Sequence, residues 1–289
     1  MPSKRDLATL IGVLLCTTGC WDEQTAWYHA TFSDDDQAVV LLRDDYEQRT
    51  YGRSGIIGSY PTRNHRHQLF IHDLRTGDQR PLGAQSPGQA PEQLHFMRSA
   101  GYVLATYFEY GETPGIRVQQ RWLDGRTVPI LDHPFSRPDG PQCDLARVIP
   151  SPGGETLAIV REPPDCQAFR VDISLLDART LAVLTQQELV FDGAPFEPQF
   201  QRNLAVTWSV EGTLEVDNLT TPGGAVSIAL DGRTTPRAPV LCNDPPTSSS
   251  EYSDDGLRRV VAADGGIRMV AIEDHPMPFP CQEAVHGRP

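Results

Sequence analysis

One tetrapeptide recurs four times along the chain at nearly constant spacing: an aspartate, a variable residue, an arginine and a threonine. The copies begin at Asp73, Asp124, Asp177 and Asp231, which are 51, 53 and 54 residues apart. Just before two of the copies, apolar residues alternate with other residues, a pattern typical of a half-buried strand that ends in a turn. A period of about 50 residues indicates repeated sheet units, because each unit needs neighbours to cover its faces.

A second marker, a turn that begins with serine, precedes each tetrapeptide and is followed by an apolar run. Asp-Gly, Gly-Gly and Glu-Gly pairs in these turns supply the positive φ that two-residue hairpin turns need. Each unit is therefore predicted to hold four antiparallel strands, which is the make-up of a propeller blade. We predict an all-β fold, a single β-propeller of about five four-stranded blades over residues 27–285. The serines are Ser33, Ser99, Ser151, Ser209 and Ser253.

Two segments fit this repeat less well. The stretch 176–191 has apolar residues at spacings that also suit a helix, although its place in the repeat favours a turn and an outer strand. In the fifth unit, Asp274 begins a different turn, and prolines follow at positions 276, 278 and 280. Proline discourages a central strand, so we interpret this unit as the closing blade.

Two of the turns resemble those of a known repeat family. Ser-Pro-Gly-Gly-Glu-Thr-Leu-Ala at 151–158 and Asp-Leu-Arg-Thr-Gly at 73–77 are similar to the turns of WD-like β-propeller repeats. Within that group the chain most resembles the TolB-type propellers of the bacterial periplasm. The resemblance implies a propeller with a tendency towards protein binding, and it supplies no catalytic residues.

The first twenty residues look like an export signal. Lys4 and Arg5 precede an apolar run over 7–15 that is too short to cross a bilayer as a helix. The Thr-Gly-Cys ending resembles the leader of bacterial lipoproteins, which implies a signal peptide over 1–19, a lipid on Cys20 and a short tether over 20–26. By the sorting habit of that family, the absence of aspartate directly after Cys20 implies the outer membrane. The alternative is a plain secretory leader that is cut nearby.

Charge and motifs exclude several functions. The formal net charge is −13, and an acidic surface repels phosphate backbones, so we do not expect nucleic acid as a partner. Lys4 is the only lysine, so the exported chain lacks a P-loop lysine, a Schiff-base lysine and a Ser-Lys dyad. The sequence also lacks a nucleophile elbow, a His-Glu-x-x-His motif and a nucleotide-binding glycine fingerprint. We therefore assign no catalytic residues and no cofactor.

Four cysteines remain outside the leader and Cys20, and an even number in an exported chain suggests disulfides. The blade arrangement favours Cys143 with Cys166, because both would lie in loops that open onto the same face. Cys242 would then pair with Cys281 and link the last blade to the C-terminus. Four reduced, buried thiols are the alternative, and a zinc site is disfavoured because no cysteine has a closely spaced partner.

Other polar clusters are interpreted as structural. His65 and His67 would share one face if they lay on a strand, with His72 nearby, but no carboxylate brackets them closely, so we predict exposed loop histidines and no metal. The acidic runs 34–36 and 254–255 lack the full ligand spacing of a calcium loop and occupy hairpin positions that favour aspartate. The repeated aspartate-to-threonine turns are likewise explained by backbone hydrogen bonds within a tight turn.

The candidate binding site is an insertion in the first unit, which is longer than its siblings between residues 46 and 67. Arginine and tyrosine often anchor interfaces, and loops on a rigid scaffold often carry binding, so this basic and aromatic segment is the best candidate. A solvated insertion is the alternative. The expected function is a membrane-anchored, non-enzymatic module that binds an envelope or surface protein; the alternative is a hydrolase with a polar site in the central channel. The candidate residues are Arg49, Tyr51, Arg53, Tyr60, Arg63, His65 and Arg66.

Overall fold

The structure is a computed structural model that describes part of the chain. The described ranges are 21–49, 62–87, 89–109, 114–134, 146–161, 169–191, 204–209, 211–218, 225–237, 258–263 and 266–271. Within them the chain forms 18 β-strands and no helix. Accordingly, these residues include no helical segment with the length and hydropathy needed to cross a bilayer.

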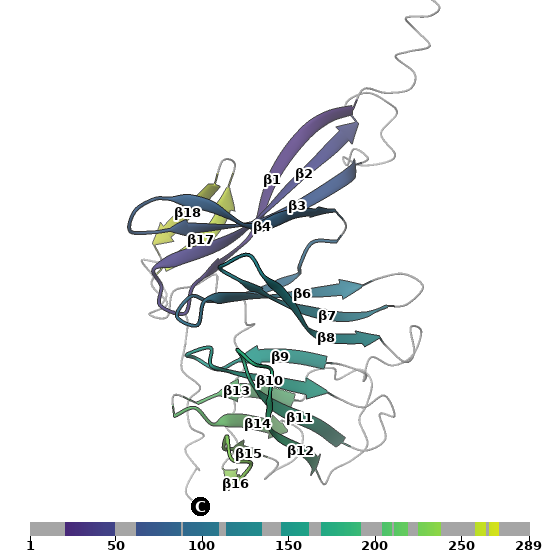
Figure 1. Ribbon diagram of the computed structural model, residues 1–289, viewed down its shortest axis with the longest axis vertical. Coiled ribbons are helices and arrows are strands. Elements are labelled where there is room, and N and C mark those ends of the chain that lie inside the picture. The colour runs from purple at the N-terminus through teal and green to yellow at the C-terminus, as the bar shows by residue number, and fades with distance from the viewer. Residues whose placement is uncertain are drawn as a thin grey trace, which may run out of the picture.

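The strands form successive antiparallel sheets in chain order (Figure 1). The first sheet contains β1 (Trp21–Phe32), β2 (Ala38–Arg49), β3 (Thr62–Asp73) and β4 (Gln79–Pro87). The second contains β5 (Gln93–Met97), β6 (Tyr102–Glu109), β7 (Gly115–Trp122) and β8 (Thr127–Pro134). The third contains β9 (Ala146–Pro150), β10 (Thr156–Arg161), β11 (Phe169–Asp177) and β12 (Val183–Phe191). The fourth contains β13 (Leu204–Trp208), β14 (Leu214–Asn218), β15 (Ala225–Ile228) and β16 (Thr234–Arg237), and the fifth has two described strands, β17 (Arg258–Ala263) and β18 (Gly266–Ala271).

Successive sheets pack face to face because their central strands are buried on both sides. In β6, Leu104 packs towards the third sheet, whereas its neighbours Val103 and Ala105 pack towards the first. In the same way, β10 directs Leu157 towards the second sheet and Ala158 towards the fourth. Strands covered on both faces need continuous apolar runs, which explains why each serine turn is followed by one. The chain is therefore all-β and folds as a single propeller built blade by blade.

The two repeated turns occupy equivalent places in the first four sheets. Each serine turn joins the first strand to the second, and each aspartate turn joins the third strand to the fourth. Since neighbouring strands are antiparallel, both turns lie at the same end of their sheet. The predicted equivalence of the repeated turns is confirmed for these four units. Ser253 and Asp274 of the fifth unit lie outside the described residues.

The aspartate turns are held by their own backbone, as expected. Asp73 accepts hydrogen bonds from the N–H groups of Arg75 and Thr76, both at 2.9 Å. Asp124 accepts one from the N–H of Arg126 at 3.0 Å, and the same type of bond recurs at Asp177 and Asp231. These backbone bonds lower the pKa of the Asp73 and Asp124 carboxyls below their usual values.

One boundary differs from the prediction. The segment 21–26 is a strand and not a tether, because Trp21 to Ala26 pair with Arg49 to Asp44 of β2. Polar residues dominate 22–25, so no apolar alternation marked this strand in the sequence.

The stretch 176–191 contains the end of β11 and all of β12, which confirms the outer strand over the helix.

Candidate functional site

The first sheet extends beyond the part that packs against its neighbours. Towards the C-terminal end of β2 and the N-terminal end of β3, the last apolar core residues are Leu42 and Leu69, which are cross-strand partners. Beyond them, β1, β2 and β3 remain paired as far as Trp21, Arg49 and Thr62. We call this extension the arm; it comprises residues 21–28, 43–49 and 62–68, and Figure 1 shows it projecting away from the second sheet.

The candidate loop is therefore partly strand. Residues 46–49 complete β2 and residues 62–67 begin β3. The segment predicted as one long loop therefore contributes the ends of two paired strands. An irregularity in the pairing between Asp45 and Glu47 faces Asn64, whose φ of 57° lies in the left-handed region that asparagine tolerates. The extra residue at this bulge sets which side chains of β3 lie on each face of the arm.

One face of the arm carries an arginine network. The Nε of Arg43 lies 2.8 Å from Oδ1 of Asp45, and the guanidinium carbon lies 6.0 Å from the centroid of the Trp27 ring. Asp45 also accepts hydrogen bonds from the hydroxyl of Thr25 and the amide of Gln85 at 2.7 and 2.9 Å. Burial alone would raise the pKa of Asp45, but the bonds from Thr25, Arg43 and Gln85 outweigh burial and lower it.

The same face continues to the tip of the arm. The guanidinium carbon of Arg63 lies 4.0 Å from the centroid of the Trp21 ring, close enough for a cation–π contact. Arg63 also donates a hydrogen bond from Nε to Glu47 at 2.7 Å, which is the main cause of the lowered pKa of the Glu47 carboxyl. These three residues join β1, β2 and β3 at the far end of the sheet.

The opposite face carries a histidine–carboxylate cluster. Asp44, whose side chain is 4% exposed, lies 2.7 Å from Nδ1 of His65 and 3.4 Å from Nδ1 of His67. The Tyr46 ring stacks on His65 with a centroid separation of 5.4 Å and an interplanar angle of 16°. At the base of the arm, Tyr28 is 42% exposed, and burial together with the charge of Asp44 raises the pKa of its hydroxyl.

The sequence missed this cluster because its carboxylate comes from the adjacent strand. Asp44 and His67 are directly opposed in the β2–β3 pairing although they are distant in sequence. The prediction of exposed loop histidines is therefore wrong: His65 and His67 both lie on β3, and His67 is buried. His72 lies near the other end of β3, outside the cluster. The alternation of Asp44 with Tyr46 was the available signal, since both lie on the strand face that His67 meets.

Of the predicted binding residues, the structure places Arg63, His65 and Arg66 on the arm and makes Arg49 the last residue of β2. Arg63 and His65 lie in the two opposite-face clusters, and Arg66 is exposed. The residues Tyr51, Arg53 and Tyr60 lie outside the described residues, as do Cys20, Cys143, Cys166, Cys242 and Cys281.

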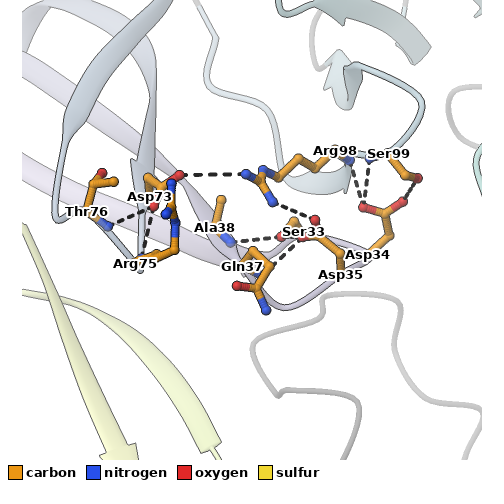
Figure 2. A network of polar contacts seen from close by, with 10 residues as sticks. All are labelled: Ser33, Asp34, Asp35, Gln37, Ala38, Asp73, Arg75, Thr76, Arg98 and Ser99. Atoms are coloured by element: carbon orange, nitrogen blue, oxygen red, sulfur yellow. Dashed lines mark hydrogen bonds and ion pairs between the residues drawn. The ribbon is translucent and has the colours of Figure 1, made fainter.

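A separate polar network joins the first two sheets at the turn-bearing end (Figure 2). Asp34 accepts hydrogen bonds from the N–H groups of Arg98 and Ser99 at 2.8 and 3.2 Å, and from the Ser99 hydroxyl. The Arg98 guanidinium lies 2.6 Å from Asp35 and 3.6 Å from Asp73. Asp34 and Asp35 thus hold neighbouring turns of the first two sheets together, from within the hairpin turn that the sequence indicated for this acidic run.

Comparison with known proteins gives distant likenesses. No protein-family model matches the chain, and no curated protein matches it. TolB from Acinetobacter baumannii is 15% identical with a TM-score of 0.41, covering 84% of this chain and 53% of TolB, so the chain spans about half of that protein. The periplasmic gluconolactonase PpgL from Pseudomonas aeruginosa is also 15% identical, with a TM-score of 0.35 over 86% of this chain and 81% of PpgL. A puromycin hydrolase is 14% identical with a TM-score of 0.35 over 76% of this chain and 39% of its own. At this distance the overlap says nothing about activity, and the propeller fold follows from the sheets themselves.

Proposed function

We propose that the protein is an exported, non-enzymatic binding module of the cell envelope that uses the arm to hold a protein partner. The observation that carries this proposal is the projection of β1, β2 and β3 past Leu42 and Leu69 (Figure 1). Strands of this length are not needed to bury the apolar core, because the buried residues of the arm, Asp44 and His67, are polar.

The side chains of the arm suit a protein interface. Tryptophan, tyrosine and arginine are the residues that most often dominate binding energy, and the arm presents all three kinds. The aromatic rings are already fixed by stacking and cation–π contacts, so little side-chain entropy is lost on binding. The aromatic and arginine side chains concerned are Trp21, Trp27, Tyr28, Arg43, Tyr46 and Arg63.

The location of the partner follows from the leader. We propose that Cys20 carries a lipid and that the protein resides in the outer membrane, as its leader implies. Trp21 lies at the tip of the arm, so the arm would then stand next to the bilayer. A partner that is embedded in the same membrane, or bound to it, would meet the faces of the arm first.

The hydrolase alternative needs converging polar side chains in the central channel. Among the described residues, the histidine and carboxylate side chains that lie close enough together to hold an ion are on the arm. We favour the binding role because the projecting arm supports it directly.

The arm can be tested with a photoreactive phenylalanine analogue placed at Tyr28 and, as a control, at Leu184 of β12, which is similarly exposed at 46%. We expect irradiation of intact cells to give a discrete protein adduct from position 28 and none from position 184.

With the adduct identified, Tyr28→Ala should weaken partner binding at least about tenfold, because interface tyrosines often contribute about 1–2 kcal/mol or more. Leu184→Ala should leave the affinity unchanged. Equal adducts at both positions, or none at position 28, would remove the arm as the binding surface.

A further inference from the structure

We propose that Asp44, His65 and His67 form a binding site for a divalent transition-metal ion such as zinc. Each residue offers one ligand atom, and these atoms all lie within 4.8 Å of one another. Oδ2 of Asp44 is 2.7 Å from Nδ1 of His65, and Oδ1 is 3.4 Å from Nδ1 of His67. A tetrahedral ion with ligands at 2.0–2.2 Å holds neighbouring ligand atoms roughly 3.3–3.6 Å apart, so only small side-chain shifts are needed.

Burial of the carboxylate gives an independent reason for a cation. Asp44 is almost fully buried, and its Oδ1 makes no hydrogen bond among the described residues. A buried carboxylate is costly unless an opposite charge compensates it. The nearby guanidinium groups of Arg43 and Arg63 are engaged by Asp45 and Glu47 on the opposite face. A metal ion held between Asp44 and the two histidines would supply the compensating charge.

The surroundings of His65 orient it as a ligand. Without an ion, Nδ1–H of His65 donates a hydrogen bond to Oδ2 of Asp44 at 2.7 Å. An ion would take the place of this proton, and the ring would then carry its proton on Nε2 and donate it to the hydroxyl of Thr62, 3.0 Å away. The stacked ring of Tyr46 fixes the plane of the imidazole. The His65 side chain is 37% exposed, whereas that of His67 is 8% exposed, so His65 offers the ion a path from solvent.

The donor set defines the class of ion. Imidazole nitrogen suits zinc, copper, iron and nickel, whereas magnesium and calcium prefer oxygen ligands throughout. Two histidines and one carboxylate leave at least one coordination position for water or for a donor from a bound protein. Because Asp44 lies on β2 and both histidines lie on β3, the ion would cross-link these strands. This proposal does not depend on the arm binding a partner.

The test uses the full-length protein in detergent, stripped of metal with a chelator and titrated with zinc chloride by calorimetry. We expect one zinc per chain, and Asp44→Asn and His65→Ala should each weaken binding at least about tenfold. The matched control is His72→Ala, which removes a histidine from the same strand outside the cluster and should change the affinity less than twofold. Cobalt in place of zinc should give visible absorption bands that both variants lose.

Circular dichroism of each variant checks that the fold is kept, and His65→Ala keeps the test decisive if Asp44→Asn does not fold, because His65 is partly exposed. Hydrogen exchange provides a readout that needs no spectroscopic metal: zinc should slow exchange of arm amides in the wild type and not in His65→Ala. Absence of stoichiometric zinc binding, or equal affinity in wild type, Asp44→Asn and His65→Ala, would overturn the proposal.

Discussion

Glycine at position 154 meets two separate constraints, which makes it a sensitive test of how the second and third sheets pack. Its φ is +73°, and a Cβ at this position would lie 2.8 Å from the Cβ of Ala100 and 3.0 Å from that of Met97. Gly212 occupies the equivalent turn of the fourth sheet with a φ of +78° and open space around it. We expect Gly154→Ala to lower the free energy of unfolding by about 2–4 kcal/mol, and Gly212→Ala by only about 1–2 kcal/mol. Urea unfolding measures both, and equal losses would show that the sheets do not meet this closely.

A second prediction at this scale concerns pH. His95 lies on β5, and burial lowers its pKa from 6.5 to about 4. The unfolded chain therefore binds a proton below pH 6.5 that the folded chain takes up only near pH 4, so stability is lost as the pH falls through this window. We expect a loss of about 1–3 kcal/mol, less than full burial would give because the ring keeps some solvent contact. His95→Gln should remove this part of the slope in unfolding free energy between pH 7 and 4, whereas His72→Gln should not. A slope identical in wild type and His95→Gln would contradict the prediction.

At the scale of strands and turns, the sequence predicted the elements that depend on interactions within a few residues. The serine and aspartate turns were predictable because each uses a side-chain oxygen and a positive φ within a few residues: Oγ of Ser151, for example, accepts the N–H of Thr156 at 3.1 Å, and Gly154 supplies the φ. The outer strand β12 was predictable from its place in the repeat. The arm was not, because residues 22–25 are polar and exposed and are held as a strand only by pairing with β2. The Asp44 cluster was missed for the same reason, since cross-strand register decides which distant residues meet.

At the scale of the whole molecule, the fifth and first sheets bring distant parts of the chain together. Val260 of β17 is buried in a cluster with Phe32 of β1 and Leu41 of β2. We expect Val260→Ala to lower the free energy of unfolding by roughly 1–3 kcal/mol, because it removes buried methyl groups from this junction. The control is Val190→Ala on β12, where the side chain is 64% exposed and the change should be within about 0.5 kcal/mol. Urea unfolding followed by tryptophan fluorescence distinguishes them, and no difference between the two variants would show that the junction contributes little to stability.

The disulfide prediction belongs to the same scale and stays a prediction. Ala146 at the start of β9 pairs with Arg161 at the end of β10, so the segments that hold Cys143 and Cys166 leave the third sheet at the same end. Non-reducing peptide mapping tests this pairing together with that of Cys242 and Cys281.

The start of β1 at Trp21 has a mechanical consequence. If Cys20 carries a lipid, that lipid is attached directly next to Trp21, the first residue of a strand that is paired with β2. The 12 residues of β1 would then form a rigid support roughly 40 Å long. The serine and aspartate turns would then stand at the distal side, facing the aqueous compartment at a set height. A change in the tilt of β1 relative to the bilayer would rotate all the blades together, so the orientation of the propeller would be coupled to that of the membrane.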